Sequence, residues 1–289
     1  MMKQTKIRIK TPWVIFQKRD SLSLLLYLLV MLSAAITVGS LLFLTGYILV
    51  KGIPYLSADL FSFHYTSENV SLFPALVNTL IMTLLALLLA APLGIFSAIY
   101  LVEYAKRGNR LVGMIRLTAE TLSGIPSIVY GLFGLLFFVM ALGWGYSILA
   151  GACTLAIMIL PLILRTTEEA LQAVPDTYRE GSFGLGAGRL RTVFIIVLPS
   201  ATPGILAGVI LGAGRIVGET AALIYTAGTE AQVPKSLFSS GRTLSVHMYN
   251  LSREGLYVNE SYATAVVLLG IVLGINGLST LVAKKIGKG

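Results

Sequence analysis

Residues 121–164 have the sequence TLSGIPSIVYGLFGLLFFVMALGWGYSILAGACTLAIMILPLIL, in which no Asp, Glu, Lys or Arg occurs. A helix needs about 20 residues to cross roughly 30 Å of hydrocarbon, so this stretch is long enough for two crossings. The segment Gly143-Trp144-Gly145-Tyr146 is a natural turn between them, because its amphipathic rings suit the membrane interface. The stretch therefore predicts two membrane-spanning helices joined by a short turn.

Four more uncharged windows extend this pattern along the chain, at residues 21–50, 69–102, 192–214 and 261–283. Pro199 and Pro203 are expected to break the beginning of the third of these windows, so we predict its crossing at about 204–227. The first window is too long for a signal-peptide core and has no cleavage site, which favours an uncleaved first span. The sequence thus predicts an all-α, polytopic integral membrane protein with about six transmembrane helices.

Composition agrees with this fold class, since 56% of the 289 residues are hydrophobic and only 12% are charged. If the N-terminus is cytoplasmic, 17 of the 22 Lys and Arg residues fall on the cytoplasmic side. The net charge of +9 therefore indicates membrane orientation and not a nucleic-acid partner. We predict a basic cytoplasmic N-terminus (1–20) and a transmembrane domain (21–289), with both termini cytoplasmic. The predicted loops are external at 51–70, cytoplasmic at 165–200 and external at 228–260.

Few residues offer covalent or metal chemistry. The single Cys153 cannot form an internal disulfide and suits small apolar packing. His64 and His247 have no neighbours at metal-ligand spacing, so no metal site is expected. No G-x4-G-K-[ST] motif is present, so this chain is not expected to bind ATP or any other cofactor itself.

The loop at 165–200 contains the spacing E-x5-G-x9-I-x-L-P, which runs from Glu180 to Pro199. Thr177-x-x-Glu180 fits a capping box, and Gly186 with Gly188 fits a helix C-cap and a tight turn. The expected unit is a short helix, a sharp turn and a second helix that presents apolar side chains such as Phe183. Such a unit can insert into a groove on another protein, or it can lie on lipid headgroups.

A charged pair follows in Gly214-Arg215-Ile-Val-Gly218-Glu219-Thr220. On a continuous helix, Arg215 and Glu219 share one face, and the predicted span places Arg215 near mid-membrane. A guanidinium there suits a tetrahedral oxyanion, which its fork meets with two parallel hydrogen bonds. A structural salt bridge and an interfacial arginine are the alternatives. The preceding Gly204-x3-Gly208-x3-Gly212 allows close helix packing, either within the bundle or between subunits.

Together these stretches resemble the PstA-type permease of the phosphate ABC importer. The resemblance rests on the E-x5-G-x9-I-x-L-P loop, which is similar to the EAA loop of importer permeases. It also rests on Gly124–Gly134, on Ala213–Ala221 and on the segment Thr243-Leu-Ser-Val-His247-Met-Tyr249. Two departures are small: Gly181 and Ser182 replace the loop's alanines, and Ala222 stands where relatives often have proline.

The resemblance implies a type I ABC importer permease that carries phosphate across a prokaryotic cytoplasmic membrane without chemistry of its own. It implies a PstC-type second permease, a dimeric ATPase that binds the ATP, and an external phosphate-binding protein as partners. The implied substrate path contains Arg215, Glu219, Thr220 and Ser127. The implied ATPase-coupling residues are Glu180, Gly181, Ser182, Phe183, Gly186 and Pro199.

Two rivals remain at this point. An importer of sulfate, molybdate or an amino acid fits the coupling loop equally well. An ion-coupled secondary transporter would work without an ATPase, although no inverted repeat with matched broken helices is evident. A membrane enzyme fits less well, because no nucleophile-and-base set gathers on one side of the membrane.

Overall fold

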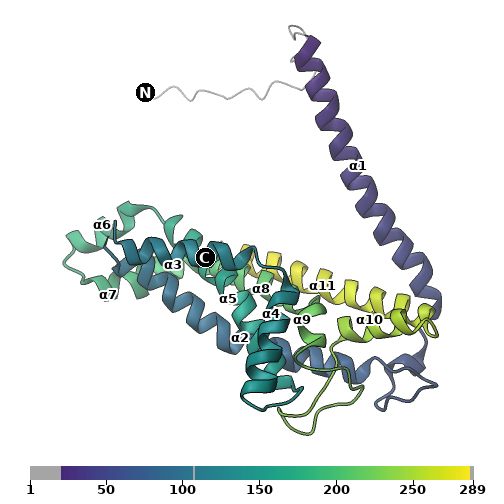
Figure 1. Ribbon diagram of the computed structural model, residues 1–289. Coiled ribbons are helices and arrows are strands. Elements are labelled where there is room, and N and C mark those ends of the chain that lie inside the picture. Colours follow the sequence, from purple (N-terminus) through teal and green to yellow (C-terminus); the bar gives the residue numbers. More distant parts are fainter. Residues whose placement is uncertain (1–20, 107, 287–289) are drawn as a thin grey trace. The chain divides into compact units, whose positions relative to one another are not determined.

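The computed structural model describes residues 21–106 and 108–286, and every regular element among them is helical (Figure 1). The predicted N-terminal segment 1–20 lies outside the described residues. The long helices are α1 (Ser21–Gly52), α2 (Phe73–Ile99), α5 (Ile148–Gln172), α8 (Leu198–Val217) and α11 (Val258–Ile286). The shorter α-helices are α3 (Arg110–Ser123), α4 (Ser127–Gly134), α6 (Asp176–Gly184), α7 (Arg189–Thr192), α9 (Ala221–Ile224) and α10 (Leu244–Glu254).

Tighter or wider helical turns lie beside these elements. Two 3₁₀ turns, η2 (Ile53–Tyr55) and η3 (Ala58–Phe61), follow α1. Three π-helical segments extend longer helices: η4 (Tyr100–Tyr104) after α2, η5 (Leu135–Ala141) after α4, and η6 (Val193–Val197) before α8. The chain divides into two compact units, residues 1–50 and 51–289, and the sites below all lie in the second.

The number of spans agrees with the expectation from sequence. Among the described residues, five helices are long and apolar enough to cross a membrane, and a sixth span forms if the bent pair 110–123 and 127–141 is counted as one. The pair bends by 101° at Gly124-Ile125-Pro126, where proline disfavours helical geometry at the residue before it. The predicted turn at 143–146 is present, and Gly143 and Gly145 adopt φ of +66° and +64°.

The prediction for the crossing near Pro199 was wrong. The helical span runs from Arg189 to Val217 without a break, and both prolines lie within it. The π-helical turn before Pro199 widens the backbone where the ring would otherwise meet a carbonyl of the preceding turn. The hydroxyls of Ser200 and Thr202 donate to the carbonyls of Ile196 and Leu198, at 2.7 and 2.8 Å, within the same helix.

The core of the second unit is a bundle of α2, α5 and α8, with α9 and α10 packed against it. The glycines of the G-x3-G-x3-G motif face α5 of the same chain. A Cβ added to Gly204 would lie 2.7 Å from the Cβ of Ala170, and Gly208 lies directly against Thr166. The motif therefore serves packing within the bundle. Cys153 is half-buried beside an apolar cluster, in line with its predicted packing role.

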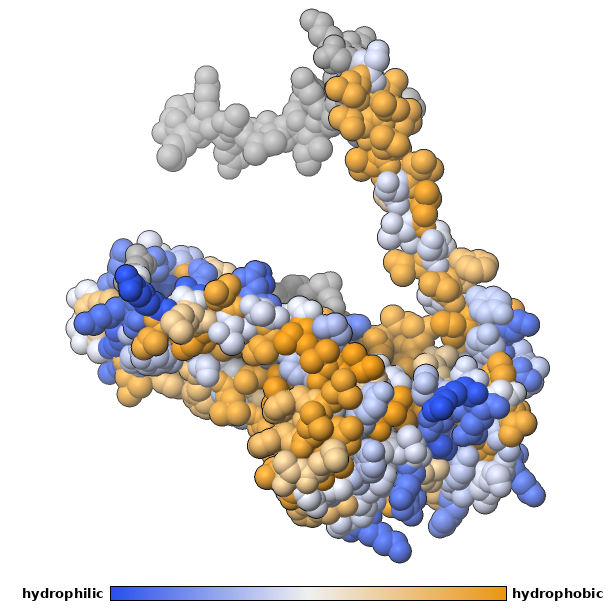
Figure 2. All heavy atoms as spheres, in the orientation of Figure 1, coloured by the Kyte–Doolittle hydropathy of each residue, from blue (hydrophilic) through white to orange (hydrophobic). Residues whose placement is uncertain are grey.

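Polar segments gather at two ends of the second unit, as Figure 2 shows by its blue side chains beside α6 and α7 and around α10. At one end, an ion pair joins α6 to η4, and a second ion pair joins α3 to the last turns of α5. At the other end, the loops predicted to be external join one another. The Tyr257 hydroxyl donates to the Ser67 carbonyl at 2.8 Å, and the amide N–H of Ile148 donates to the Ser239 carbonyl at 3.0 Å. We call these the α6 end and the α10 end.

Candidate functional site

The loop at the α6 end folds into the expected helix–turn–helix. After α6, Gly186 adopts a left-handed φ of +83°, and Leu185 is the C-cap. The amide of Ala187 donates to the Ser182 carbonyl at 3.1 Å, and that of Gly186 donates to the Phe183 carbonyl at 2.9 Å. These two bonds define a Schellman motif, which ends α6 sharply and turns the chain toward α7.

The predicted capping box at the start of α6 is not formed. The helix begins at Asp176, one residue before Thr177, with Pro175 as the N-cap and without a side-chain cap bond. Thr177 is therefore the second residue of the helix, whereas a capping box requires it at the N-cap position. Glu180 therefore lies on the exposed side of α6 and does not reach back to the first turn.

The exposed side of α6 and its turn presents apolar side chains to the outside. Tyr178 and Phe183 are about half exposed, and Leu185 is 91% exposed. A Cβ added to Gly181 would meet nothing within 4 Å, so this backbone is open to close approach by another molecule. Ser182 faces inward and shares a hydrogen bond of 2.8 Å with Thr192 of α7. Exposed aromatic and aliphatic groups around an open glycine are suited to insertion into a partner's groove.

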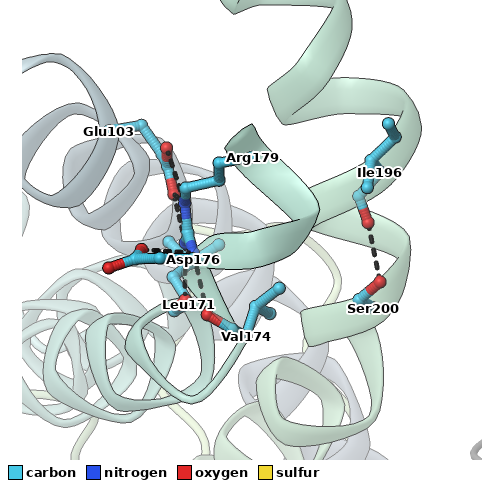
Figure 3. Close-up of polar contacts among 7 residues, drawn as sticks. All are labelled: Glu103, Leu171, Val174, Asp176, Arg179, Ile196 and Ser200. Carbon is cyan, nitrogen blue, oxygen red and sulfur yellow. Dashed lines mark hydrogen bonds and ion pairs between the residues drawn. The ribbon is translucent and has the colours of Figure 1, made fainter. Parts of the chain in front are cut away.

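Arg179 fixes α6 to two spans (Figure 3). Its Nε and Nη2 atoms donate to the Glu103 carboxylate in η4, at 3.1 and 2.7 Å. Its remaining donors reach the carbonyls of Leu171 and Val174, at 2.9 and 2.8 Å, and the carboxylate of Asp176 at 3.2 Å. The side chains of Arg179 and Glu103 are only 14% and 7% exposed. One guanidinium thus ties the α6 helix to the ends of α2 and α5.

A polar cleft of about 600 Å³ lies beside this anchor. Cationic and anionic side chains both line it, including Lys106, Arg116, Arg189, Glu103 and Asp176. The ion pair between Arg116 of α3 and Glu168 of α5, at 3.1 Å, stands at its edge. Pro199, the last residue of the loop motif, lies away from the cleft at the start of α8 and is exposed.

The residues of the predicted substrate path lie around a break in the bundle, which separates Arg215 from Glu219. Because α8 ends at Val217, Arg215 occupies its last turn and not the middle of a continuous helix. In the described part of the chain, Arg215 and Glu219 form no ion pair with each other. The Glu219 carboxylate instead accepts from the Ala222 amide at 3.1 Å, at the start of α9. The predicted shared helical face is therefore wrong, since the helix stops between the two residues.

Ser127 and Thr220 border this break. Thr220 immediately precedes α9, and Ser127 is the first residue of α4. The two helices pack closely, because a Cβ added to Gly131 of α4 would lie 2.8 Å from the Cα of Ala222 in α9. The structure thus brings the elements that carry Ser127, Thr220 and Glu219 together, although no hydrogen bond joins these side chains in the described residues. Their role in substrate passage stays a prediction.

The surroundings of two pairs of residues were not predicted from the sequence. Glu103 and Arg179 are 76 positions apart, and no local spacing marks them as partners. Arg242 and His247 lie at the α10 end and are 6% and 0% exposed. The segment Thr243–Tyr249 was noted as a motif, but its periodicity says nothing of burial. The only sequence feature that marked Arg242 was its position as a single charge in an otherwise uncharged run of the loop.

Comparison with known proteins agrees with this architecture. The family model of the binding-protein-dependent transport system inner membrane component matches residues 90–288. The probable ABC transporter permease protein YqgI of Bacillus subtilis (strain 168) is 35% identical over 280 residues, which cover 88% of this chain and 94% of that protein. The phosphate transport system permease protein PstA of Mycobacterium leprae (strain TN) is 34% identical over 205 residues, which cover 70% of this chain and 67% of that protein.

A solved structure shares the fold. A chain in the crystal structure of a bacterial alginate ABC transporter, in complex with an alginate pentasaccharide-bound periplasmic protein, superposes with a TM-score of 0.67 at 17% identity. The match covers 91% of this chain and 95% of that chain. The chain therefore belongs to the family of binding-protein-dependent transport system inner membrane components. It is a membrane-spanning permease subunit of an ABC importer.

Proposed function

We propose that this subunit forms half of a pathway for inorganic phosphate, in a complex with a PstC-type second permease. The observation that carries the proposal is Arg215, a cation in the last turn of a membrane-spanning helix, beside the break at which Glu219 caps α9. A guanidinium in a low-dielectric surrounding attracts an oxyanion strongly and can donate two parallel hydrogen bonds to it. The similarity to phosphate permeases over about two thirds of the chain supports the same substrate.

In this proposal the α6 end is cytoplasmic and binds a dimeric ATPase, while the α10 end faces an external phosphate-binding protein. Closure of the ATPase would push on α6. The Arg179 anchor would pass that movement to α2 and α5, because its guanidinium holds the Glu103 carboxylate and two carbonyls at the end of α5. The π-helical turn at Val193–Val197 follows α7 and offers a place where α8 can adjust.

Sidedness is tested by single cysteines in a chain whose native Cys153 is changed to Ser. Lys106→Cys at the α6 end and Ser67→Cys at the α10 end are both exposed positions. We expect a membrane-impermeant maleimide to label Ser67→Cys in intact cells and Lys106→Cys only after permeabilisation. Labelling of Lys106→Cys in intact cells would overturn the orientation.

Substrate identity is tested by uptake into proteoliposomes that contain the whole importer. We expect ATP-dependent uptake of radioactive phosphate, competition by arsenate, and no competition by sulfate, molybdate or amino acids. Omission of this subunit should abolish uptake. Competition by sulfate or molybdate, with no phosphate uptake, would leave an ABC importer permease with a different anion as cargo.

A further inference from the structure

Arg242 is a buried cation without an anionic partner. It immediately precedes the N-cap of α10, its side chain is 6% exposed, and its backbone is fixed by a 3.0 Å bond from its amide to the Glu230 carbonyl. Among the described residues it makes no ion pair, and its Nε and Nη2 atoms are buried without a hydrogen-bond partner. Buried charges in proteins are almost always paired, so these two donors are suited to an anionic group.

The two unpartnered nitrogens lie on the same edge of the guanidinium. Nε and Nη2 donate in parallel directions, which is the geometry that meets two oxygens of one carboxylate or phosphate. Arg179 of this same chain shows the edge in use, since its Nε and Nη2 hold the Glu103 carboxylate. The ring of Tyr65 covers the flat face of Arg242 at 4.7 Å from centroid to Cζ, and cation–π contact of this kind leaves the edge free.

Two other polar residues, His247 and Asn78, lie close to Arg242. His247 is fully buried, its ring stands edge-on to Tyr65 at 6.2 Å between centroids, and the imidazole meets the backbone of Val70. Burial and the Arg242 cation lower the pKa of His247 to about 3, so the imidazole is neutral near pH 7 and adds no second positive charge beside Arg242. Asn78 donates to the carbonyls of Gln232 and Arg242, at 3.0 and 3.1 Å.

The cluster is connected to the predicted substrate path. Ser245, in the first turn of α10, donates to the backbone carbonyl of Glu219. Tyr65 belongs to a loop that ends at Val70, whose φ of +46° is the one left-handed non-glycine value in the described chain. A β-branched residue in this conformation is strained, and strain of this kind is found where a structure fixes a functional loop. Tyr65 of this loop lies over Arg242, and Ser245, three residues further along the chain, contacts the Glu219 carbonyl.

We propose that the Nε–Nη2 edge of Arg242 is an oxyanion subsite that the structure shows closed under Tyr65. This inference rests on the proposed function, because it names a second position for the same phosphate at the α10 end. The anion would meet Arg242 after leaving the external binding protein and would pass from there toward Glu219 and Arg215. Movement of Tyr65 off the guanidinium would admit it.

The test uses the complete importer in detergent, with binding of radioactive inorganic phosphate measured by equilibrium dialysis, and ATP-driven uptake measured in proteoliposomes. Arg242→Gln removes the charge, and Arg242→Lys keeps it without the paired donors. Arg253→Gln is the control, because Arg253 is an exposed arginine in the last turn of the same helix. Co-purification of the partner subunits reports assembly for every variant.

We expect Arg242→Gln to weaken phosphate binding roughly tenfold or more, because a hydrogen bond to a charged group is lost on both oxygens. Phosphate binding by Arg242→Lys should lie between that of Arg242→Gln and that of the wild type. Arg253→Gln should bind phosphate as well as the wild type does. Equal phosphate binding and uptake by Arg242→Lys and the wild type would overturn the subsite, even if Arg242→Gln fails to assemble. An Arg242→Gln complex that assembles and transports fully would overturn it as well.

Two further results separate the inference from the proposed function. If the wild-type importer neither binds nor transports phosphate, the proposed function fails and the subsite fails with it. If the wild type transports phosphate while Arg242→Gln loses only its association with the external binding protein, the partner of Arg242 is a protein carboxylate. That result would also overturn the phosphate subsite.

Discussion

Arg179 is largely buried and Arg242 is buried, at opposite ends of the second unit, and the two arginines use their guanidinium groups differently. At the α6 end, Arg179 has its fork filled by Glu103 and its other donors filled by carbonyls. At the α10 end, the same fork of Arg242 has no partner among the described residues. A fully paired charge fixes elements to one another, whereas an unpaired one leaves donors for a ligand. The difference suggests that one end transmits movement and the other receives the substrate.

The largest effect is expected between the two ends, at Arg215. Arg215→Gln should abolish phosphate uptake or reduce it at least roughly a hundredfold, because it removes the cation that draws the anion into a low-dielectric region. Arg215→Lys should restore only part of the activity, since a point charge lacks the paired donors. Uptake is measured in proteoliposomes and corrected for the amount of assembled complex.

Glu219→Gln sharpens this prediction. The carboxylate accepts from the Ala222 amide and does not pair with Arg215, and a neutral amide oxygen can replace it there. We therefore expect a milder loss than for Arg215→Gln. An equal loss from both changes would show that the two charges act together in a conformation different from this one.

At the α6 end, the strongest effect is expected from Arg179→Gln. Breaking a buried ion pair leaves the Glu103 carboxylate uncompensated, which costs about 3–5 kcal/mol of folding free energy. Arg165→Gln is the matched control, because its pair with Glu169 is exposed, at 57% and 65%, and is worth about 0–1 kcal/mol. Thermal unfolding of the purified complex measures both.

A second change, at Glu103, distinguishes a role of this ion pair in transmitting movement from a role in folding stability alone. Glu103→Gln in the Arg179→Gln background removes both charges and should recover part of the lost stability. Coupling of ATP hydrolysis to uptake should stay impaired, because the α6 helix is no longer tied to α2. Full coupling in the double variant would contradict the role of this pair in transmitting movement.

Acidification should destabilise the α10 end through His247. Its pKa is about 3 in the folded chain, against an ordinary value of 6.5, because burial and Arg242 disfavour the imidazolium. The unfolded chain therefore binds the proton more tightly, and the free energy of unfolding falls as pH drops from 6.5 toward 3. The loss is about 1.4 kcal/mol per pH unit once the unfolded histidine is protonated, and about 2 kcal/mol at pH 5.

His247→Gln checks this sign. The variant lacks the titrating imidazole, so its unfolding temperature should fall less between pH 7 and pH 5 than that of the wild type. All other titrating groups are common to both proteins and drop out of the comparison. An identical pH dependence for the two proteins would show that His247 does not stay neutral in the folded chain.

The smallest effect is expected at the turn after α6. Gly186→Ala places a Cβ on a residue with φ of +83°, which costs about 1–2 kcal/mol, although no neighbour lies within 4 Å. The turn should loosen and ATPase co-purification should weaken, with the permease still inserted. Gly184→Ala is the control, because this glycine is equally open but helical. Equal ATPase recovery for both variants would argue against this turn as the docking element.

The sequence predicted the features that depend on composition and local geometry. Uncharged windows located the spans, and paired glycines located the turn at 143–146 and the left-handed Gly186. The helix through Pro199 was missed because a π-helical turn accommodates the ring, and no residue pattern announces such a turn. The capping box at Thr177 failed because Pro175 already starts the helix.

The contacts of the charged residues could not be predicted from the sequence, for a different reason. The pair of Glu103 with Arg179 and the approach of Tyr65 to Arg242 join segments that lie 76 and more residues apart. Periodicity reports which face of one helix is apolar, but not which residue of another helix meets it. The role of Arg215 was inferred on the assumption of a continuous helix, and the structure replaces that helix with a break at Gly218.

The central claim is that this permease carries phosphate past Arg215 when its partner ATPase hydrolyses ATP. The most direct measurement is uptake of radioactive phosphate by proteoliposomes that hold the complete importer, its binding protein and ATP inside. The account predicts uptake that arsenate inhibits and that Arg215→Gln abolishes in a complex that still assembles. Full phosphate uptake by the assembled Arg215→Gln importer would contradict it.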